Sequence, residues 1–156
     1  MQTIRTMFAH LDWANRRLLE SLRSARLDEA GKAAPLFQHL LQAERIWLTR
    51  LRREDSRHLP LWGDDVDLDA CASLIVANAA GFRDLFDTLH EDALDQPVSY
   101  RSQAGDPFES TVRDILTHVA LHGQYHRAQI NTALRAGGFE PATLDYILYV
   151  RLRDKA

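Results

Sequence analysis

The sequence predicts an all-α protein, a four-helix bundle that forms one domain over residues 1–156. Apolar residues recur at intervals of three and four along four segments of about twenty residues each. Helices of this length that carry one apolar stripe bury it against one another, which gives a bundle. A chain of 156 residues is also long enough to enclose a substantial core in one domain.

The first two helices are predicted from their apolar stripes. The helix over residues 3–26 carries a stripe formed by Ile4, Phe8, Leu11, Leu18 and Leu22. The helix over residues 35–53 carries a stripe formed by Phe37, Leu40, Leu41, Leu48 and Leu51. The loop that follows, DSRHLPLWGDDVD, is rich in helix breakers and long enough to cross the end of a bundle.

The last two helices are bounded by residues that favour helix ends. Asp67 is expected to cap the third helix, which extends to about His90. The fourth helix is expected over residues 111–136, where the Gly137-Gly138 pair would stop it. The tail PATLDYILYVRLRD is apolar enough to pack back on the other helices as a last short helix.

One segment between the third and fourth helices departs from helical spacing. In VSYRSQAGDPFEST, polar and apolar residues alternate on both sides of a Gly-Asp pair. This alternation and the central turn residues favour a short β-hairpin directly before the fourth helix.

Composition and charge argue against several classes of protein. The 46% hydrophobic and 26% charged content is ordinary for a globular protein, and the formal net charge of -3 argues against a nucleic-acid partner. No apolar segment reaches the length of a membrane span and no signal peptide is recognised, so we expect no membrane association. Cys71 is the sole cysteine, which excludes an internal disulfide and favours a cytoplasmic location. We interpret it as a small core residue.

Three histidines follow one another at intervals of four in HVALHGQYHRAQI: His118, His122 and His126. His122 and His126 fall on the apolar stripe of the fourth helix, and their spacing puts both rings on one face, about 6 Å apart along the axis. Two such histidines can hold one metal ion, because Zn–N bonds are only about 2.0–2.1 Å long. The alternative is a pair of core residues that hydrogen-bond within the protein. The position of both rings on the buried stripe favours the metal.

A third ligand is expected from another helix, because His118 lies about 12 Å along the axis from His126. His39 on the second helix is the natural candidate. The other histidines lie among polar residues, in a loop or at a helix end (His10, His58 and His90). Three histidine ligands leave coordination positions open for water or substrate, as in catalytic metal sites.

The candidate catalytic residues, His118 and Glu44, belong to no established motif. The glutamate of H-E-x-x-H, the Glu-x-x-His of di-iron bundles and the glycine motifs of nucleotide sites are all absent. His118 is interpreted either as a proton acceptor beside the metal or as a surface residue. Glu44 is expected near the inner face of the second helix, where it either orients a ligand histidine or pairs with an arginine.

Other polar and aromatic residues have structural interpretations. Asn15 lies on the side of the first helix that faces the core, and it is expected to hydrogen-bond across the bundle. Arg127 is interpreted as a solvated or interface residue. Gln129 and Tyr125 either line the pocket or pack, and the tryptophans are interpreted as packing residues.

Three motifs resemble the DinB/YfiT-like family. The segment HGQYHRAQI is similar to the family pattern H-G-x-x-H-R-G-Q-I, with Ala128 in place of a glycine. The segment HLLQAERIWLTRL is similar to the family's histidine followed by a glutamate and a tryptophan, and LDWANRRLL is similar to its W-x-N helix. The tail PATLDYILYV also fits, so the resemblance spans essentially the whole chain.

The resemblance implies an up-down-down-up bundle, often dimeric, with a divalent metal ion on His39, His122 and His126. Zinc or nickel is the expected ion, and iron or another divalent ion is the alternative. It also implies a thiol-dependent S-transferase that acts on a small-molecule substrate with a low-molecular-weight thiol. The alternatives are a metal-dependent hydrolase and a non-catalytic bundle with a structural metal or a ligand-binding role. We accordingly expect a homodimer.

Overall fold

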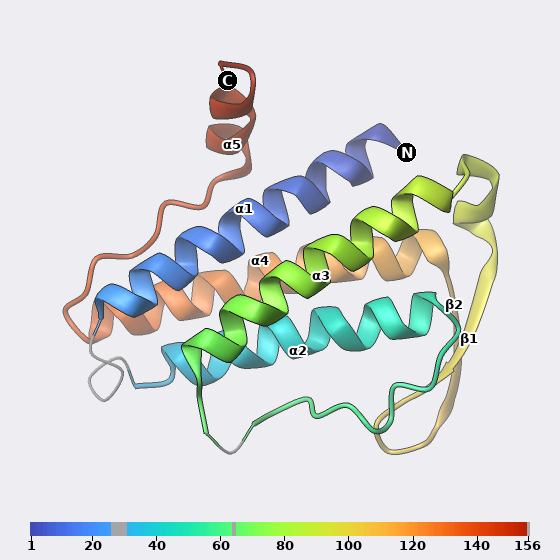
Figure 1. The fold of residues 1–156 in the computed structure, drawn as a ribbon, viewed down its shortest axis with the longest axis horizontal. Helices are drawn as coiled ribbons and strands as arrows, with labels where there is room; N and C mark the ends of the chain where they lie inside the picture. The colour runs from blue at the N-terminus through green and yellow to red at the C-terminus, as the bar shows by residue number, and fades with distance from the viewer. Residues whose placement is uncertain (26–30, 64, 156) are drawn as a thin grey trace.

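The computed structural model describes residues 1–25, 31–63 and 65–155. Within these residues the chain is mostly helical, with five α-helices, one 3-10 helix and a two-stranded antiparallel sheet (Figure 1). In chain order the elements are α1 (Gln2–Ser24), α2 (Ala33–Leu51), α3 (Leu68–Thr88), η1 (Glu91–Asp95), β1 (Pro97–Arg101), β2 (Pro107–Thr111), α4 (Val112–Ala136) and α5 (Tyr146–Arg153).

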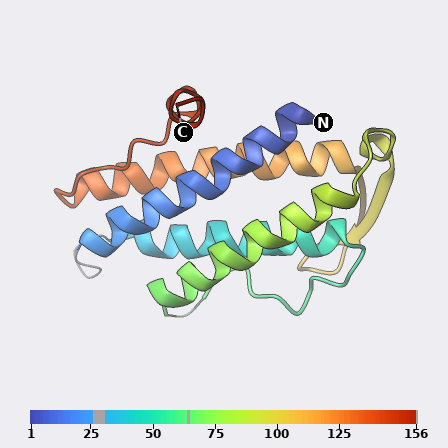
Figure 2. The ribbon, with the colours of Figure 1, turned by 45° about the horizontal axis from the view of Figure 1, so that its top comes forward.

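The four long helices form two layers. In Figures 1 and 2, α1 lies beside α3 in one layer, and α2 lies beside α4 in the other. Figure 1 also shows that α1 and α4 run in one direction, whereas α2 and α3 run in the opposite direction. Because α2 and α3 point the same way, the segment after α2 returns along the length of that helix. From its length this segment was expected to cross the end of a bundle, whereas the up-down-down-up order that the resemblance implies expects the lengthwise path.

Capping residues set the helix boundaries close to their predicted positions. The Asp67 side chain accepts a hydrogen bond from the backbone N–H of Asp69 at 2.8 Å, which confirms the predicted cap of α3. The Thr111 hydroxyl accepts one from the N–H of Asp114 at 3.0 Å, so Thr111 caps α4 instead of being its first residue. Helix α4 ends at Ala136, as predicted from the glycine pair that follows.

The other two helices differ slightly from the prediction. Helix α2 begins and ends two residues earlier than expected, and Arg53 beyond its end adopts the left-handed conformation, with φ of 61°. Helix α1 ends at Ser24. The predicted end at Arg26 lies outside the described residues.

The predicted hairpin is confirmed and leads directly into α4. Strands β1 and β2 pair antiparallel, and the backbone N–H of Ser102 donates to the carbonyl of Asp106 at 2.8 Å across the turn. Gly105 in this turn has φ of 96°, a conformation that strongly favours glycine. Val98 on β1 is buried, so the hairpin covers one end of the core.

The tail returns to α1 as the predicted short helix, α5. The carbonyl of Leu144 accepts a hydrogen bond from Nε2 of His10 at 2.8 Å, and the rings of Trp13 and Tyr149 lie 5.6 Å apart. His10 was expected among polar neighbours, but this packing buries it. None of the helices in the described part of the chain combines the length and apolar character needed to cross a lipid bilayer.

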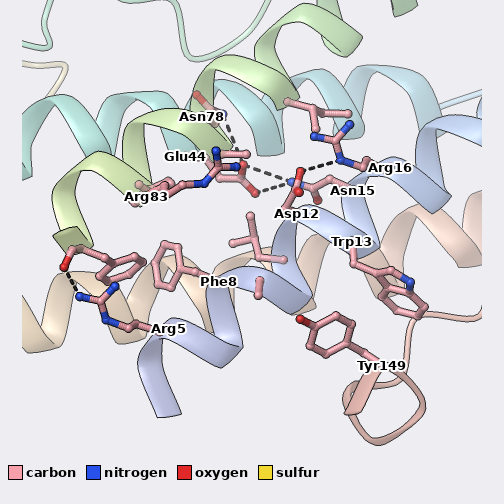
Figure 3. Close-up of a pocket in the computed structure, with 16 residues that line it drawn as sticks. Arg5, Phe8, Asp12, Trp13, Asn15, Arg16, Glu44, Asn78, Arg83 and Tyr149 are labelled. Atoms are coloured by element: carbon pink, nitrogen blue, oxygen red, sulfur yellow. Dashed lines mark hydrogen bonds and ion pairs between the residues drawn. The ribbon is translucent and has the colours of Figure 1, made fainter. Parts of the chain in front are cut away.

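A polar layer divides the core into two apolar clusters. One cluster contains Phe37 and Ile130, and the other contains Phe8, Phe82 and Phe86. Between them, each long helix contributes one buried polar side chain, and this set is called the polar layer below: Asn15, Glu44, Asn78 and Arg127. Figure 3 shows the hydrogen bonds that join three of its members.

Candidate metal centre

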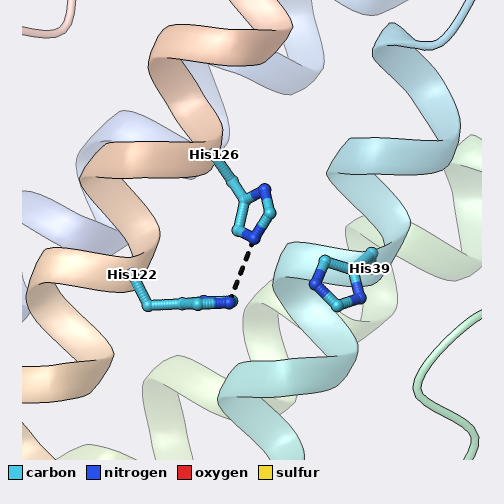
Figure 4. A group of neighbouring side chains, drawn as sticks. All are labelled: His39, His122 and His126. Atoms are coloured by element: carbon cyan, nitrogen blue, oxygen red, sulfur yellow. Dashed lines mark hydrogen bonds between the residues drawn. The ribbon is translucent and has the colours of Figure 1, made fainter.

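Three histidines from α2 and α4 converge on one point (Figure 4). One ring nitrogen from each of His39, His122 and His126 can be chosen so that all three lie within 4.8 Å of one another. The Nε2 atoms of His122 and His126 are 3.0 Å apart. Helices α2 and α4 pack side by side, so the single histidine of α2 meets the histidine pair of α4.

This geometry fits a metal ion. Two nitrogen ligands on a tetrahedral zinc ion at about 2.0–2.1 Å lie roughly 3.3 Å from each other. The two Nε2 atoms of His122 and His126 already lie close to that separation. Two nitrogen lone pairs at this distance require a proton or a cation between them. The predicted ligand set is therefore brought together, with three ligand atoms that could hold one ion.

The outer nitrogens of two rings are held by oxygen atoms. Nδ1 of His39 lies 3.1 Å from the carbonyl oxygen of Leu61, and Nδ1 of His126 lies 2.8 Å from Oε1 of Gln129. Because these oxygens only accept hydrogen bonds, each Nδ1 carries the hydrogen and each Nε2 keeps its lone pair. Metal-binding histidines are oriented in this way. Gln129 thus lies beside the site, and the orienting role considered for Glu44 belongs to Leu61 and Gln129.

The surroundings keep the rings of His39 and His122 neutral. Burial, together with the nearby His126 and His118, lowers the pKa of His122 to about 4. Burial also lowers the pKa of His39. A neutral imidazole has the free lone pair that a metal ion needs, so these two rings could serve as ligands at neutral pH.

Trp62 covers the outer side of His39. The two rings stack with centroids 3.9 Å apart and an interplanar angle of 12°, although Trp62 is 54% exposed. The preceding residue, Leu61, supplies the carbonyl that orients the same histidine. Two consecutive residues of the segment after α2 therefore act on His39: the Leu61 carbonyl sets the orientation of its ring, and the Trp62 ring covers one face of it.

We expect Trp62→Ala to weaken metal binding about ten-fold, because loss of residues that orient a ligand costs about 10- to 100-fold in affinity. Competition with a chromogenic chelator measures the change. The Trp62→Phe variant keeps an aromatic face over His39 and should stay within about two-fold of wild type. Equal affinities for the alanine variant and the wild type would show that the stack contributes nothing to the site.

His118 lies next to the cluster but is not one of its three members. Its side chain is exposed, with its ring 4.9 Å from Trp47 and 5.3 Å from the ring of His122. The exposed Tyr125 packs its ring 5.2 Å from that of His126. Cys71 is buried in the core, as predicted, and burial raises its pKa to about 11, so it is a poor nucleophile.

Arg127 is buried, in contrast to the prediction from the sequence. It was interpreted as solvated or at an interface, but only 1% of it is exposed, and Nη1 donates to Oδ1 of Asn15 at 3.1 Å. A Cβ added to Gly123 would lie 2.9 Å from Nη1 of Arg127, so this glycine makes room for the guanidinium. The buried face of α4 thus contains Gly123 and Arg127, and the two histidines flank it half-buried. The Gly-x-x-x-Arg spacing was the one feature of the sequence that could have indicated this burial, because residues four apart on a helix are neighbours.

Glu44 belongs to the polar layer and is 2% exposed. Asn15 donates to both of its carboxylate oxygens, at 2.9 and 3.2 Å, and Asn78 donates to one of them at 3.3 Å. The predicted cross-helix hydrogen bond of Asn15 is therefore confirmed. Burial raises the pKa of Glu44 to about 7, although the hydrogen bond from Asn15 and the charge of Arg127 oppose this shift. Among the described residues, none of the three clustered histidines bonds to it.

The free energy of unfolding should depend on pH because of the raised pKa of Glu44. The folded protein holds a proton on Glu44 up to about pH 7, whereas the carboxyl otherwise loses it near 4.5. Its stabilising contribution is therefore complete below about pH 4.5 and is lost as the pH rises through 7, by about 3 kcal/mol in total. Urea unfolding of wild type and Glu44→Gln across this range isolates the effect, because the histidines contribute equally to both proteins. A constant difference between the two curves would contradict it.

Comparison with known proteins shows which sequences this chain is similar to. A model of the DinB family matches residues 1–155. The protein named Protein DinB from Bacillus subtilis (strain 168) is 35% identical over 60 residues, which cover 38% of this chain and 35% of that protein. The matched region thus spans little more than a third of that relative's length.

Proposed function

The chain belongs to the DinB family, and from this premise we propose that it binds a divalent metal ion through His39, His122 and His126 and acts as a metal-dependent enzyme. One observation carries the proposal. Three ring nitrogens gather within 4.8 Å, and two of the rings have their other nitrogen held by an oxygen acceptor. Zinc or nickel suits this set of imidazole ligands.

We propose that the reaction is the transfer of a low-molecular-weight thiol to a small electrophilic substrate. A divalent ion in this position would lower the pKa of a coordinated thiol or water. Leu61 and Gln129 keep the ligand rings in place, and Trp62 shields one side of the site. The sulfur forms a bond to an electrophilic carbon as the leaving group departs, and the thiol proton passes to His118 or to solvent.

Hydrolysis is the second candidate. The ligand group contains three histidines, with no fourth ligand residue among the described parts of the chain, so coordination positions stay available for water. His122 and His126 are only half-buried, which leaves solvent a route to the site. A structural metal without turnover is the non-catalytic alternative.

We also propose the finer description of the fold and its assembly. The directions of the four long helices in Figure 1 support an up-down-down-up four-helix bundle in a single domain. A homodimer is supported by Leu121 and Tyr125, which are one turn apart on α4 and both 62% exposed, because a partner could cover them. The buried sole cysteine supports a cytoplasmic location.

Elemental analysis tests the metal proposal directly. Protein purified without a histidine tag should carry close to one equivalent of a divalent metal, and His39→Ala should carry far less, because it lacks the ligand from α2. The metal-loaded wild type is then assayed with thiol and electrophile pairs and with hydrolase substrates. A wild type that neither retains metal nor takes up added zinc or nickel would overturn the proposal.

A further inference from the structure

A cavity of about 450 Å³ lies between α1 and α3, in the layer that does not contain the three histidines (Figure 3). Its apolar walls include Phe8, Phe82 and Phe86, and none of the three histidines lines it. Glu44 and Asn78 of the polar layer also line it. A volume of several hundred Å³ with apolar walls and a few polar groups is typical of small-molecule sites.

The polar part of this cavity has an excess of hydrogen-bond acceptors. The Glu44 carboxylate receives hydrogen bonds only from the side-chain amides of Asn15 and Asn78 among the described residues. Arg127 donates to Asn15 and not to Glu44, so its positive charge balances the carboxylate only through the intervening asparagine. The raised pKa of Glu44 shows that these neighbours do not offset the cost of burying its charge. A positively charged group in the cavity would offset it.

The walls suit a cation with an apolar body. The ring of Phe8 lies 4.6 Å from that of Phe82 and 5.0 Å from that of Phe86, so three aromatic rings meet at the cavity. Aromatic surfaces bind apolar groups and also attract ammonium ions.

Three arginines at the cavity raise the opposite expectation, an anionic ligand. However, Arg16 is paired with Asp12 at 2.9 Å, and Arg5 is 3.7 Å from Asp87. Arg83 is exposed, so its charge is well solvated. An anion held by these side chains would leave the buried carboxylate of Glu44 without compensation. The chemistry of the buried end therefore favours a cation.

We propose that this cavity is a second ligand site, which binds a small organic ammonium compound with its ammonium group on Glu44 and its apolar body against the phenylalanine rings that line the cavity. The site is separate from the histidine cluster, so the proposal is independent of metal binding and of the reaction.

Three probes with closely similar bodies and different polar ends test the proposal: 2-phenylethylamine, 2-phenylethanol and 3-phenylpropionate. Calorimetric titration of the full chain is done at about pH 8, one unit above the pKa of Glu44, so that the carboxylate is ionised. The ammonium probe should bind about ten-fold more tightly than the alcohol, as a charge-assisted hydrogen bond implies, and the carboxylate should bind most weakly. In Glu44→Gln the preference for the ammonium probe should disappear.

A pair of alanine substitutions on α3 provides the matched control. Ala79 lines the cavity, so Ala79→Leu fills part of it and should weaken binding of the ammonium probe at least ten-fold. Ala77 is exposed on a different face of α3, and Ala77→Leu should leave binding unchanged. Circular dichroism confirms that each variant is folded.

Three results would overturn the proposal. These are equal or tighter binding of the carboxylate probe, an unchanged ammonium preference in Glu44→Gln, and the absence of saturable binding by any probe. If Glu44→Gln fails to fold, the alanine pair still provides a test. Equal binding of the ammonium probe by the Ala79→Leu and Ala77→Leu variants would then overturn the proposal.

Discussion

Arg127→Ala should lower the free energy of unfolding by about 3–5 kcal/mol, the usual cost of removing one partner from a buried charged network. The guanidinium is almost completely buried and donates to Asn15, which in turn donates to Glu44. Without it, the Glu44 carboxylate has no buried positive charge nearby and a cavity is left behind. Urea unfolding at neutral pH measures the loss.

Arg135→Ala is the control for this prediction. Arg135 lies on the same helix but is exposed, so its loss should change stability by no more than about 0.5 kcal/mol. Combining Arg127→Ala with Glu44→Gln should recover part of the loss, because the uncompensated carboxylate is then also removed. Similar stabilities for the two single arginine variants would show that the polar layer does not depend on the guanidinium.

Zinc or nickel should stabilise the protein, and His122→Ala should abolish this effect. An ion that binds only the folded state adds about 2.7 kcal/mol at a free concentration 100 times its Kd. For a domain of this size, that corresponds to a rise of roughly 5–10 °C in the unfolding temperature. His122 is a suitable substitution because its ring lies near both other histidines, with centroid distances of 4.4 Å to His126 and 5.7 Å to His39.

His118→Ala is the matched control, one turn earlier on α4. It removes an imidazole next to the cluster but none of the three grouped nitrogens, so most of the metal-dependent shift should remain. Calorimetric or fluorescence melting with and without the ion gives the comparison. If His118→Ala lost as much of the shift as His122→Ala, His118 would have to be counted among the ligands.

Local signals predicted most of the helices, the hairpin and the pairing of His122 with His126. The cap at Asp67, the hairpin around Gly105 and the spacing of His122 and His126 each depend on residues close in sequence. The position of Leu61 and Trp62 beside His39 was not predictable in this way. It depends on the direction in which α3 runs relative to α2, which no short segment encodes.

The polar layer was missed for a different reason. An arginine such as Arg127 is almost never fully buried unless it is paired, so its sequence position favours a solvated interpretation. Its partner lies 112 residues away on α1, and the glycine that admits it is one turn earlier on α4. The apolar stripe of α4 was consequently placed one residue away from its buried centre. The histidine pair was still found, because i, i+4 spacing holds on any face of a helix.

The polar layer has a consequence for how the helices can slide past one another. A slip of α4 by one turn would move its side chains about 5.4 Å along the axis. Arg127 would then lose its hydrogen bond to Asn15, and its charged guanidinium would lie in one of the apolar clusters, at a cost of several kcal/mol. The same slip would carry His122 and His126 away from His39. The layer thus fixes the axial alignment of α2 and α4, and only in that alignment do the three imidazoles meet.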